Sequence, residues 1–132
     1  MLLAVIELGG YPNFSSVYER AGFDVVTVTS VRKALAELKR LIPSVVVAEF
    51  NFQSDFRDRT SSLESLLAVV QRHAGARVIV FYEREQEHQL ARLRASYSIH
   101  AALSYPISER ELEAALANTV IQQREAGTAT KN

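Results

Sequence analysis

The sequence has no cysteine and no tryptophan, and its 132 residues include only three prolines and five glycines. Without cysteine the chain forms no disulfide and no thiolate metal site, so a reducing compartment is its simplest home. Metal-ligand spacing is also missing, because His73, His88 and His100 fall in separate segments, where surface or capping roles are expected. Charge of one sign is not in excess either, since 15 Lys and Arg balance 15 Asp and Glu. This balance argues against nucleic acid and membrane surfaces as partners.

Long apolar runs are absent as well. The apolar start from Met1 to Ile6 is followed by Glu7, with no basic leader and no cleavage site, so no signal peptide is predicted. No segment approaches the roughly 18 apolar residues of a membrane helix. The sequence therefore predicts a soluble cytoplasmic protein. We expect one domain over residues 1–122, followed by a flexible tail over residues 123–132 that has no apolar face.

Five short runs rich in β-branched residues have the length of one strand: Leu2 to Leu8, Asp24 to Thr29, Ser44 to Phe50, Arg77 to Tyr82, and Ile99 to Ser104. They lack polar alternation, which is typical of a parallel sheet with helices on both faces. The segments after them repeat apolar residues at helical spacing, and the second of these patterns runs from Val31 to Ile42. Five such units predict an α/β fold, a flavodoxin-like, doubly wound parallel sheet of strand order 2-1-3-4-5.

Residues typical of helix starts and stops occupy the expected junctions: Ser30, Ser61 with Glu64, Ser108 with Glu111, Gly22, and Gly75. Ligands of such sheets bind at the carboxyl ends of the strands. The residues that follow each strand therefore decide what the protein does.

Two of these strand ends carry a family resemblance. The stretch from Pro43 to Glu49 places an acid six residues after a proline, and Ser104, Tyr105 and Pro106 follow the fifth strand. With the five units, they make the chain from about residue 2 to residue 121 resemble the receiver domains of two-component response regulators. The resemblance implies that Glu49 stands at the place of the phospho-accepting aspartate. It also implies that Tyr105 replaces a lysine that contacts the phosphoryl group before a cis-linked proline.

The other active-site positions implied by the resemblance are altered too. Glu7 is the single acid where the family has two or more that hold magnesium, and Tyr82 stands in place of a threonine or serine. Ala102 occupies the aromatic switch position. Arg84 is left as the one possible substitute cation, and its planar guanidinium does not replace an ammonium point charge.

These changes remove what phosphoryl transfer needs, namely positioning and neutralisation of charge on the phosphoryl oxygens. The Glu49 carboxylate also lies one methylene further from the backbone than that of an aspartate. Glu7 and Glu49 are the candidates to hold magnesium. We therefore interpret the chain as a non-enzymatic, receiver-like signalling module that has no cofactor, is not phosphorylated in the usual manner and acts by binding proteins.

Other interpretations remain open at this point. The module is alternatively a phosphorelay receiver with residual magnesium-dependent transfer to Glu49, or a small-molecule or flavin-binding protein of the same fold. Glu49 itself is either a fixed negative charge that partly imitates an acylphosphate or an exposed strand-end acid bonded to a neighbouring loop. Tyr82 and Tyr105 are expected to fill the former pocket with their rings.

The resemblance also implies an interaction surface. In receivers, the face made by the fourth helix, the fifth strand and the fifth helix (the α4-β5-α5 face) commonly forms dimers or docks partners. Here mixed polar and charged residues of the two helices are suited to reciprocal pairing: Gln86, Arg92, Arg94, Glu109, Arg110, and Glu113. The expected partner is therefore another signalling protein or a second copy of the chain.

Overall fold

The computed structural model describes residues 1–7, 13–50, 62–72 and 76–119. Five parallel strands form one sheet: β1 Leu2–Val5, β2 Val25–Val28, β3 Val45–Glu49, β4 Arg77–Tyr82, and β5 Ala101–Ser104. Their order is β2-β1-β3-β4-β5, which confirms the predicted doubly wound sheet. β1 ends at Val5 rather than at Leu8. The predicted domain boundary at residue 122 and the tail over residues 123–132 lie outside the described residues.

Helices connect the strands: α1 Ser15–Arg20, α2 Val31–Glu37, α3 Ser62–Val70, the 3-10 helix η1 Arg84–Gln86, and α4 Glu87–Ser96. A last helix covers residues 109–119. Within the part of the chain that the structure describes, none of the helices is long and apolar enough to cross a membrane.

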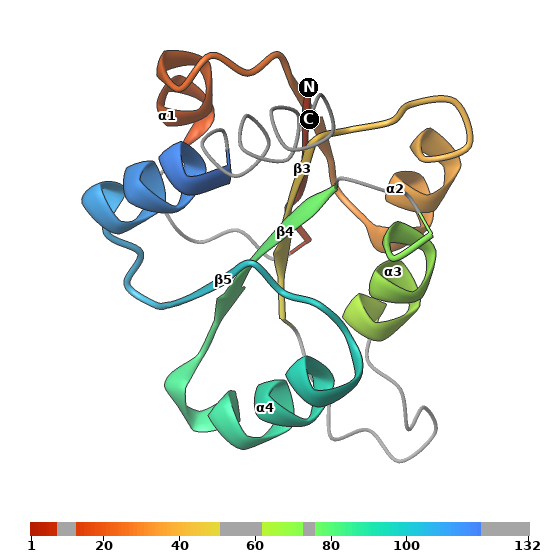
Figure 1. The fold of residues 1–132 in the computed structure, drawn as a ribbon, viewed down its shortest axis with the longest axis vertical. Coiled ribbons are helices and arrows are strands. Elements are labelled where there is room, and N and C mark those ends of the chain that lie inside the picture. The colour runs from red at the N-terminus through yellow and green to blue at the C-terminus, as the bar shows by residue number, and fades with distance from the viewer. Residues whose placement is uncertain (8–12, 51–61, 73–75, 120–132) are drawn as a thin grey trace, which may run out of the picture.

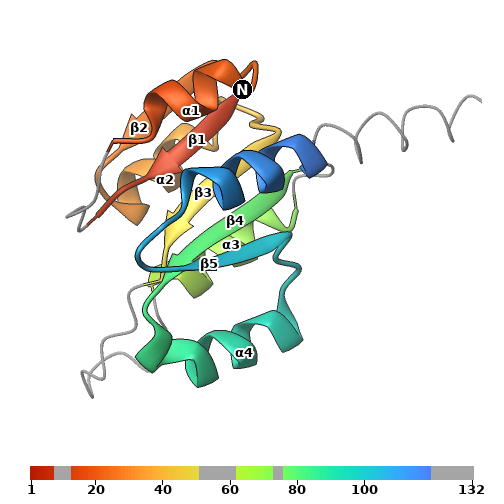
Figure 2. The ribbon, with the colours of Figure 1, turned by 90° about the vertical axis from the view of Figure 1, so that its left-hand side faces the viewer.

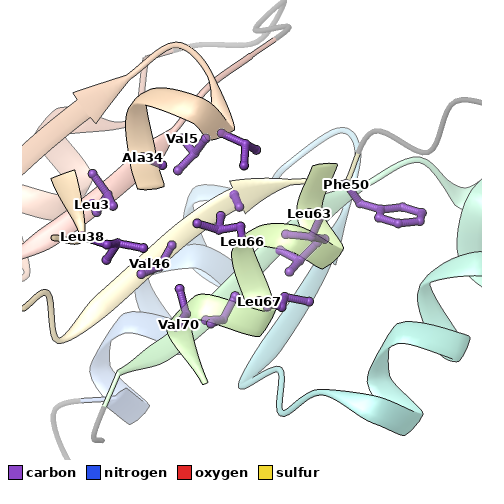
Figure 3. Packing of buried hydrophobic residues seen from close by; sticks show 14 of the residues in the cluster. Leu3, Val5, Ala34, Leu38, Val46, Phe50, Leu63, Leu66, Leu67 and Val70 are labelled. Carbon is purple, nitrogen blue, oxygen red and sulfur yellow. The ribbon is translucent and has the colours of Figure 1, made fainter. Parts of the chain in front are cut away.

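The sheet lies between two helical layers (Figure 1). On one face α1 and the last helix cover a core cluster that contains Val45 and Val47 of β3. On the other face α2, α3 and α4 cover a second cluster that contains Val46 and Ala48. Figure 3 shows this second cluster, with side chains of α3 packed against β3 and Phe50 directed toward α4. β3 is buried along its whole length because it lies at the centre of the sheet, between β1 and β4.

The helix ends follow local chemistry. The Ser30 hydroxyl accepts the backbone N–H of Lys33 at 3.1 Å and caps α2, as predicted. Ser108 accepts the N–H of Glu111 at 3.4 Å at the start of the last helix. Gly22 ends α1 with φ of +95°, a conformation that other residues rarely adopt. The predicted caps at Ser61 and Gly75 lie outside the described residues.

Ile42 differs from the prediction. It was expected on the buried face of the second helix, but α2 ends at Glu37 and the Ile42 side chain is 77% exposed. The C-cap residue Leu38 still packs in the core, and the turn that follows carries the chain to β3. The apolar spacing therefore continues about one turn beyond the end of the helix.

All strands run in one direction and the helices run in the opposite direction, so the molecule has two distinct ends (Figure 2). In Figure 2 the strands run from right to left, so their carboxyl ends lie together at the left. We call this end the carboxyl edge and the opposite end the amino edge. The carboxyl edge gathers Glu7, Glu49, Tyr82 and Tyr105, which lie far apart in the sequence.

Candidate functional site

Glu49 is the centre of the candidate site at the carboxyl edge. It ends β3, and its side chain is only 4% exposed. Its Oε1 accepts the backbone N–H of Glu7 at 2.6 Å, and the Tyr105 hydroxyl lies 3.5 Å from Oε2, the outer limit for a hydrogen bond. The carboxylate therefore joins the carboxyl ends of β1, β3 and β5. The alternative of an exposed strand-end acid is wrong in its exposure, because Glu49 is buried, but its hydrogen bond to a neighbouring segment is present, since Glu7 follows β1.

Strand geometry explains why Glu49 points to this place. Side chains alternate between the two faces of a strand, and Val45 and Val47 belong to the cluster under α1 and the last helix. Glu49 continues that series by two residues and therefore lies on the same face. Tyr105 packs against the same cluster, so the alternation on two strands brings the carboxylate and the phenol together.

The Tyr105 ring is held by an aromatic row. Its centroid is 6.3 Å from that of Phe81 at an interplanar angle of 74°, and Phe81 lies 6.0 Å from Phe14 at 80°. Both are edge-to-face contacts, a favourable geometry for aromatic pairs. The Tyr105–Pro106 bond is cis, as the resemblance implies. An apolar ring thus occupies the place where the resemblance expects a lysine.

Tyr82, Ala102 and Arg84 are not part of this contact. Tyr82 and Ala102 pack against the other cluster, under α3 and α4, so Tyr82 and Tyr105 lie on opposite faces of the sheet and do not fill one pocket together. Arg84 is the exposed first residue of η1. No ion pair found within the described residues joins it to Glu7 or Glu49.

Glu7 is half-buried beside Glu49. Loss of hydration on burial raises the pKa of its carboxyl above the usual 4.5, a hydrogen bond from the backbone of Val31 opposes this rise, and the negative charge of Glu49 adds to it. Val31 begins α2, so the Glu7 side chain links the end of β1 to the start of this helix. Two carboxylates therefore approach each other at the carboxyl edge, and each accepts a backbone N–H.

Neutralising Glu7 should stabilise the protein at neutral pH. A carboxyl whose pKa is raised by folding favours the folded state while it is protonated, and this contribution is lost as the pH rises from 4.5 through the raised pKa. Glu7→Gln should therefore increase the free energy of unfolding at pH 7 by less than about 1 kcal/mol and change it little at pH 4. Urea denaturation at both pH values measures the difference.

The exposed Glu19 of α1 offers a matched control. Glu19→Gln removes one surface carboxylate and shows how far any such removal changes the stability at the two pH values. A change in Glu7→Gln no larger than that in Glu19→Gln would contradict the assignment of the raised pKa to Glu7.

Among the residues that the structure describes, Glu7 and Glu49 by themselves do not fit a magnesium ion. Magnesium needs open oxygen ligands in near-octahedral geometry, whereas both oxygens of Glu49 already face donors and Glu7 accepts the Val31 N–H. Among the described residues no group of three or more His, Asp or Glu side chains is placed to hold a metal ion.

Phe81 is the residue that the sequence interpretation missed. It is fully buried, pairs with Glu49 in the register of β3 and β4, and supports the Tyr105 ring. The sequence did contain a signal for Phe81, because the alternation of side chains along β4 places Phe81 on the face of the sheet opposite to Tyr82. Only the register between strands shows that Phe81 and Glu49 are neighbours.

No protein-family model and no curated protein sequence matches this chain. Solved structures do match. A receiver domain from Clostridium thermocellum has a TM-score of 0.75 at 15% identity and covers 95% of this chain and 98% of its own. A response regulator from Desulfuromonas acetoxidans has a TM-score of 0.67 at 16% identity, with 92% and 97% covered. The chemotaxis response regulator CheY4 of Vibrio cholerae has a TM-score of 0.64 at 17% identity, with 92% and 95% covered.

These similarities extend over nearly the full length of each chain. The protein therefore has the fold of response regulator receiver domains, as the sequence resemblance implies. Because identities this low show the fold alone, the role of the chain has to be argued from its own residues.

Proposed function

We propose that this protein is a receiver-like signalling module that works without phosphorylation and acts by binding other proteins. The observation that carries the proposal is the buried Glu49 carboxylate at the place of the phospho-acceptor, engaged by the Glu7 N–H and facing the Tyr105 hydroxyl.

A nucleophile must be free to attack a phosphoryl donor in line and must be helped by cations that stabilise the charge of the transition state. Here one oxygen of Glu49 accepts a short backbone hydrogen bond, and the Tyr105 ring stands where an ammonium group would be needed. The one nearby cation considered from sequence, Arg84, is exposed to solvent. The site is therefore built to hold a negative charge in place, and we propose no catalytic role and no cofactor for it.

Incubation with acetyl phosphate and magnesium tests the proposal. Intact-mass spectrometry should show no added mass on this chain under conditions that phosphorylate a receiver domain with a complete active site. A gain of one phosphoryl group that disappears in Glu49→Gln would instead establish residual transfer to Glu49. A purified protein with visible absorbance from a bound chromophore would favour the flavin-binding alternative.

The face formed by α4, β5 and the last helix is the proposed interaction surface. β5 is an edge strand, and all four of its residues are half-buried rather than covered. Arg92 and Arg94 of α4 are exposed beside it. Two of the residues predicted for this face lie elsewhere: Glu113 and Glu109 reach Arg20 of α1, at 3.0 and 3.9 Å. The charges available for pairing on this face therefore come mainly from α4. The lack of cysteine favours the cytoplasm for such a module.

A further inference from the structure

The amino edge, at the end of the molecule opposite to Glu49, carries exposed apolar side chains. Among the described residues, the exposed large hydrophobic side chains are Met1 at 38% and Ile42 at 77%, and both belong to this edge. Backbone hydrogen bonds tie the edge together: Ser44 donates to the carbonyl of Met1 at 2.9 Å, and Arg77 donates to the carbonyl of Ser44 at 2.9 Å. Met1 and the turn that carries Ile42 into β3 are therefore held close together.

Three exposed cations also lie at or after the ends of helices that finish at this edge. Lys39 follows α2, Arg72 follows α3, and Arg94 lies in the last turn of α4, all exposed. Within the part of the chain that the structure describes, none of the three forms an ion pair. Arg77, at the start of β4, has a buried Nε with no hydrogen-bond partner. Two acids of this edge offset part of the charge, because Glu37 is paired with Arg40 and the exposed Asp24 precedes β2, next to the start of β1.

On the same helical layer the carboxyl edge carries a group of acids at η1 and α4, while α2 begins there with the exposed Arg32 and Lys33. Glu83, Glu85 and Glu87 are exposed in five consecutive residues around η1 and the start of α4, with Arg84 as the one cation among them. We call Glu83, Glu85 and Glu87 the acidic corner. Acids favour helix starts and cations favour helix ends. In α4, which runs antiparallel to the strands, these preferences place Glu87 at the carboxyl edge and Arg94 at the amino edge, whereas α2 has neither an acid in its first turn nor a base in its last.

The helix dipole accounts for the charges of α4 but not for the exposed Ile42. A surface with an apolar centre and a charged rim is typical of a protein interface. We propose that the amino edge of one molecule docks on the acidic corner of a second copy, so that copies associate head to tail along the strand direction.

The charge distribution favours a second copy over another acidic partner. The amino edge and the acidic corner lie in the layer of α2, α3 and α4, at its opposite ends (Figure 2). A translation along the strands therefore brings Arg94 at the end of one α4 toward Glu87 at the start of the next. Such a contact uses different surfaces on the two molecules and does not close on itself, so it supports open chains as well as dimers. It shares Arg94 with the face of α4, β5 and the last helix proposed above, but its other residues are different.

Sedimentation velocity on the full chain tests this contact. We expect the sedimentation coefficient to rise with protein concentration at about 0.01 M salt, where charges act over roughly 30 Å, and to stay constant at about 1 M salt, where screening leaves roughly 3 Å. Reversing the amino edge with Arg72→Glu and Arg94→Glu, or the acidic corner with Glu83→Lys and Glu85→Lys, should each weaken association at least about tenfold. Ile42→Ser should weaken it without any change in charge.

Mixing the two charge-reversed proteins shows whether they fail to associate because the contact is lost or because they are misfolded. The two charge-reversed proteins, each monomeric alone and folded by circular dichroism, should associate when combined in equal amounts, because each then supplies the edge that the other has lost. Arg92→Glu reverses a charge in the middle of α4 and should have no effect. A chain that stays monomeric at low salt, or a folded mixture that fails to associate, would overturn the proposal. Association abolished by Arg92→Glu alone would overturn it in favour of the α4 and β5 face.

Discussion

Replacing Phe81 with alanine should destabilise the protein by about 3–5 kcal/mol, the usual cost of emptying the space of a buried aromatic ring. The Phe81 side chain is fully buried at the end of β4 and contacts the rings of both Phe14 and Tyr105 edge-to-face. Because a domain of this size is stable by only about 5–15 kcal/mol, the loss is a large part of the total. Urea denaturation followed by circular dichroism measures it.

A double-mutant cycle shows how much of this cost concerns the candidate site. Phe81→Leu keeps most of the volume and should cost about 1–2 kcal/mol. The coupling between Phe81→Leu and Tyr105→Leu should be about 0.5–1.5 kcal/mol if the edge-to-face contact holds the Tyr105 ring. A coupling close to zero would show that Tyr105 keeps its position without Phe81.

Glu49→Ala should be the second most damaging change, with an expected loss of about 1.5–3 kcal/mol, because it leaves the Glu7 N–H without its acceptor. Hydrogen bonds to a charged group are shorter and stronger than neutral ones, and the distance from the Glu7 nitrogen to Glu49 Oε1 is short, at 2.6 Å. Thermal and urea denaturation at pH 7 measure the loss.

Glu49→Gln is the matched control, since the amide keeps an oxygen of similar reach. It should cost at most about 1 kcal/mol, so a loss equal to that of Glu49→Ala would show that the charge rather than the acceptor matters. Glu49→Gln should also lower the raised pKa of Glu7, because the neighbouring negative charge is removed. NMR titration of the Glu7 side chain measures this change.

The same variant tests whether Glu49 acts as a permanent substitute for a phosphorylated residue. If its negative charge sets the conformation of the proposed interaction surface, Glu49→Gln should shift the backbone amide signals of β5 and α4 as well as those near residue 49. Shifts confined to the ends of β1 and β3 would leave Glu49 with a purely structural role. The distinction matters because a fixed charge can only hold one state of a signalling module.

Much of the fold could be predicted because its signals are local. Five apolar runs of strand length, each followed by a helical pattern, restrict the topology strongly, since connections of parallel strands are short and right-handed. The caps at Ser30, Ser108 and Gly22 also depend on neighbours three residues away or fewer. Ile42 shows the limit of this reasoning, because a continued apolar spacing cannot tell whether the helix has already ended.

The candidate site was only half predictable. The sequence indicated that Glu49 and Tyr105 stand where an aspartate and a lysine are expected. It also led to the prediction that Tyr82 and Tyr105 fill one pocket together. The structure separates them, because the alternation of side chains along β4 directs Tyr82 to one face of the sheet while Tyr105 packs on the other. Neither the burial of Glu49 nor its bond to Glu7 has a local signal, since residues 42 positions apart make this contact.

The sequence by itself determined the architecture, the positions of the altered active-site residues and the absence of the lysine, because these follow from residue identity and short-range spacing. The tertiary structure alone decided which of those residues meet. Strand register brings the Glu49 carboxylate to the Glu7 N–H and sets Phe81 behind Tyr105. The tertiary structure also decided that the exposed Met1 and Ile42 side chains lie at one edge, because their placement depends on where each element ends in space rather than on its composition.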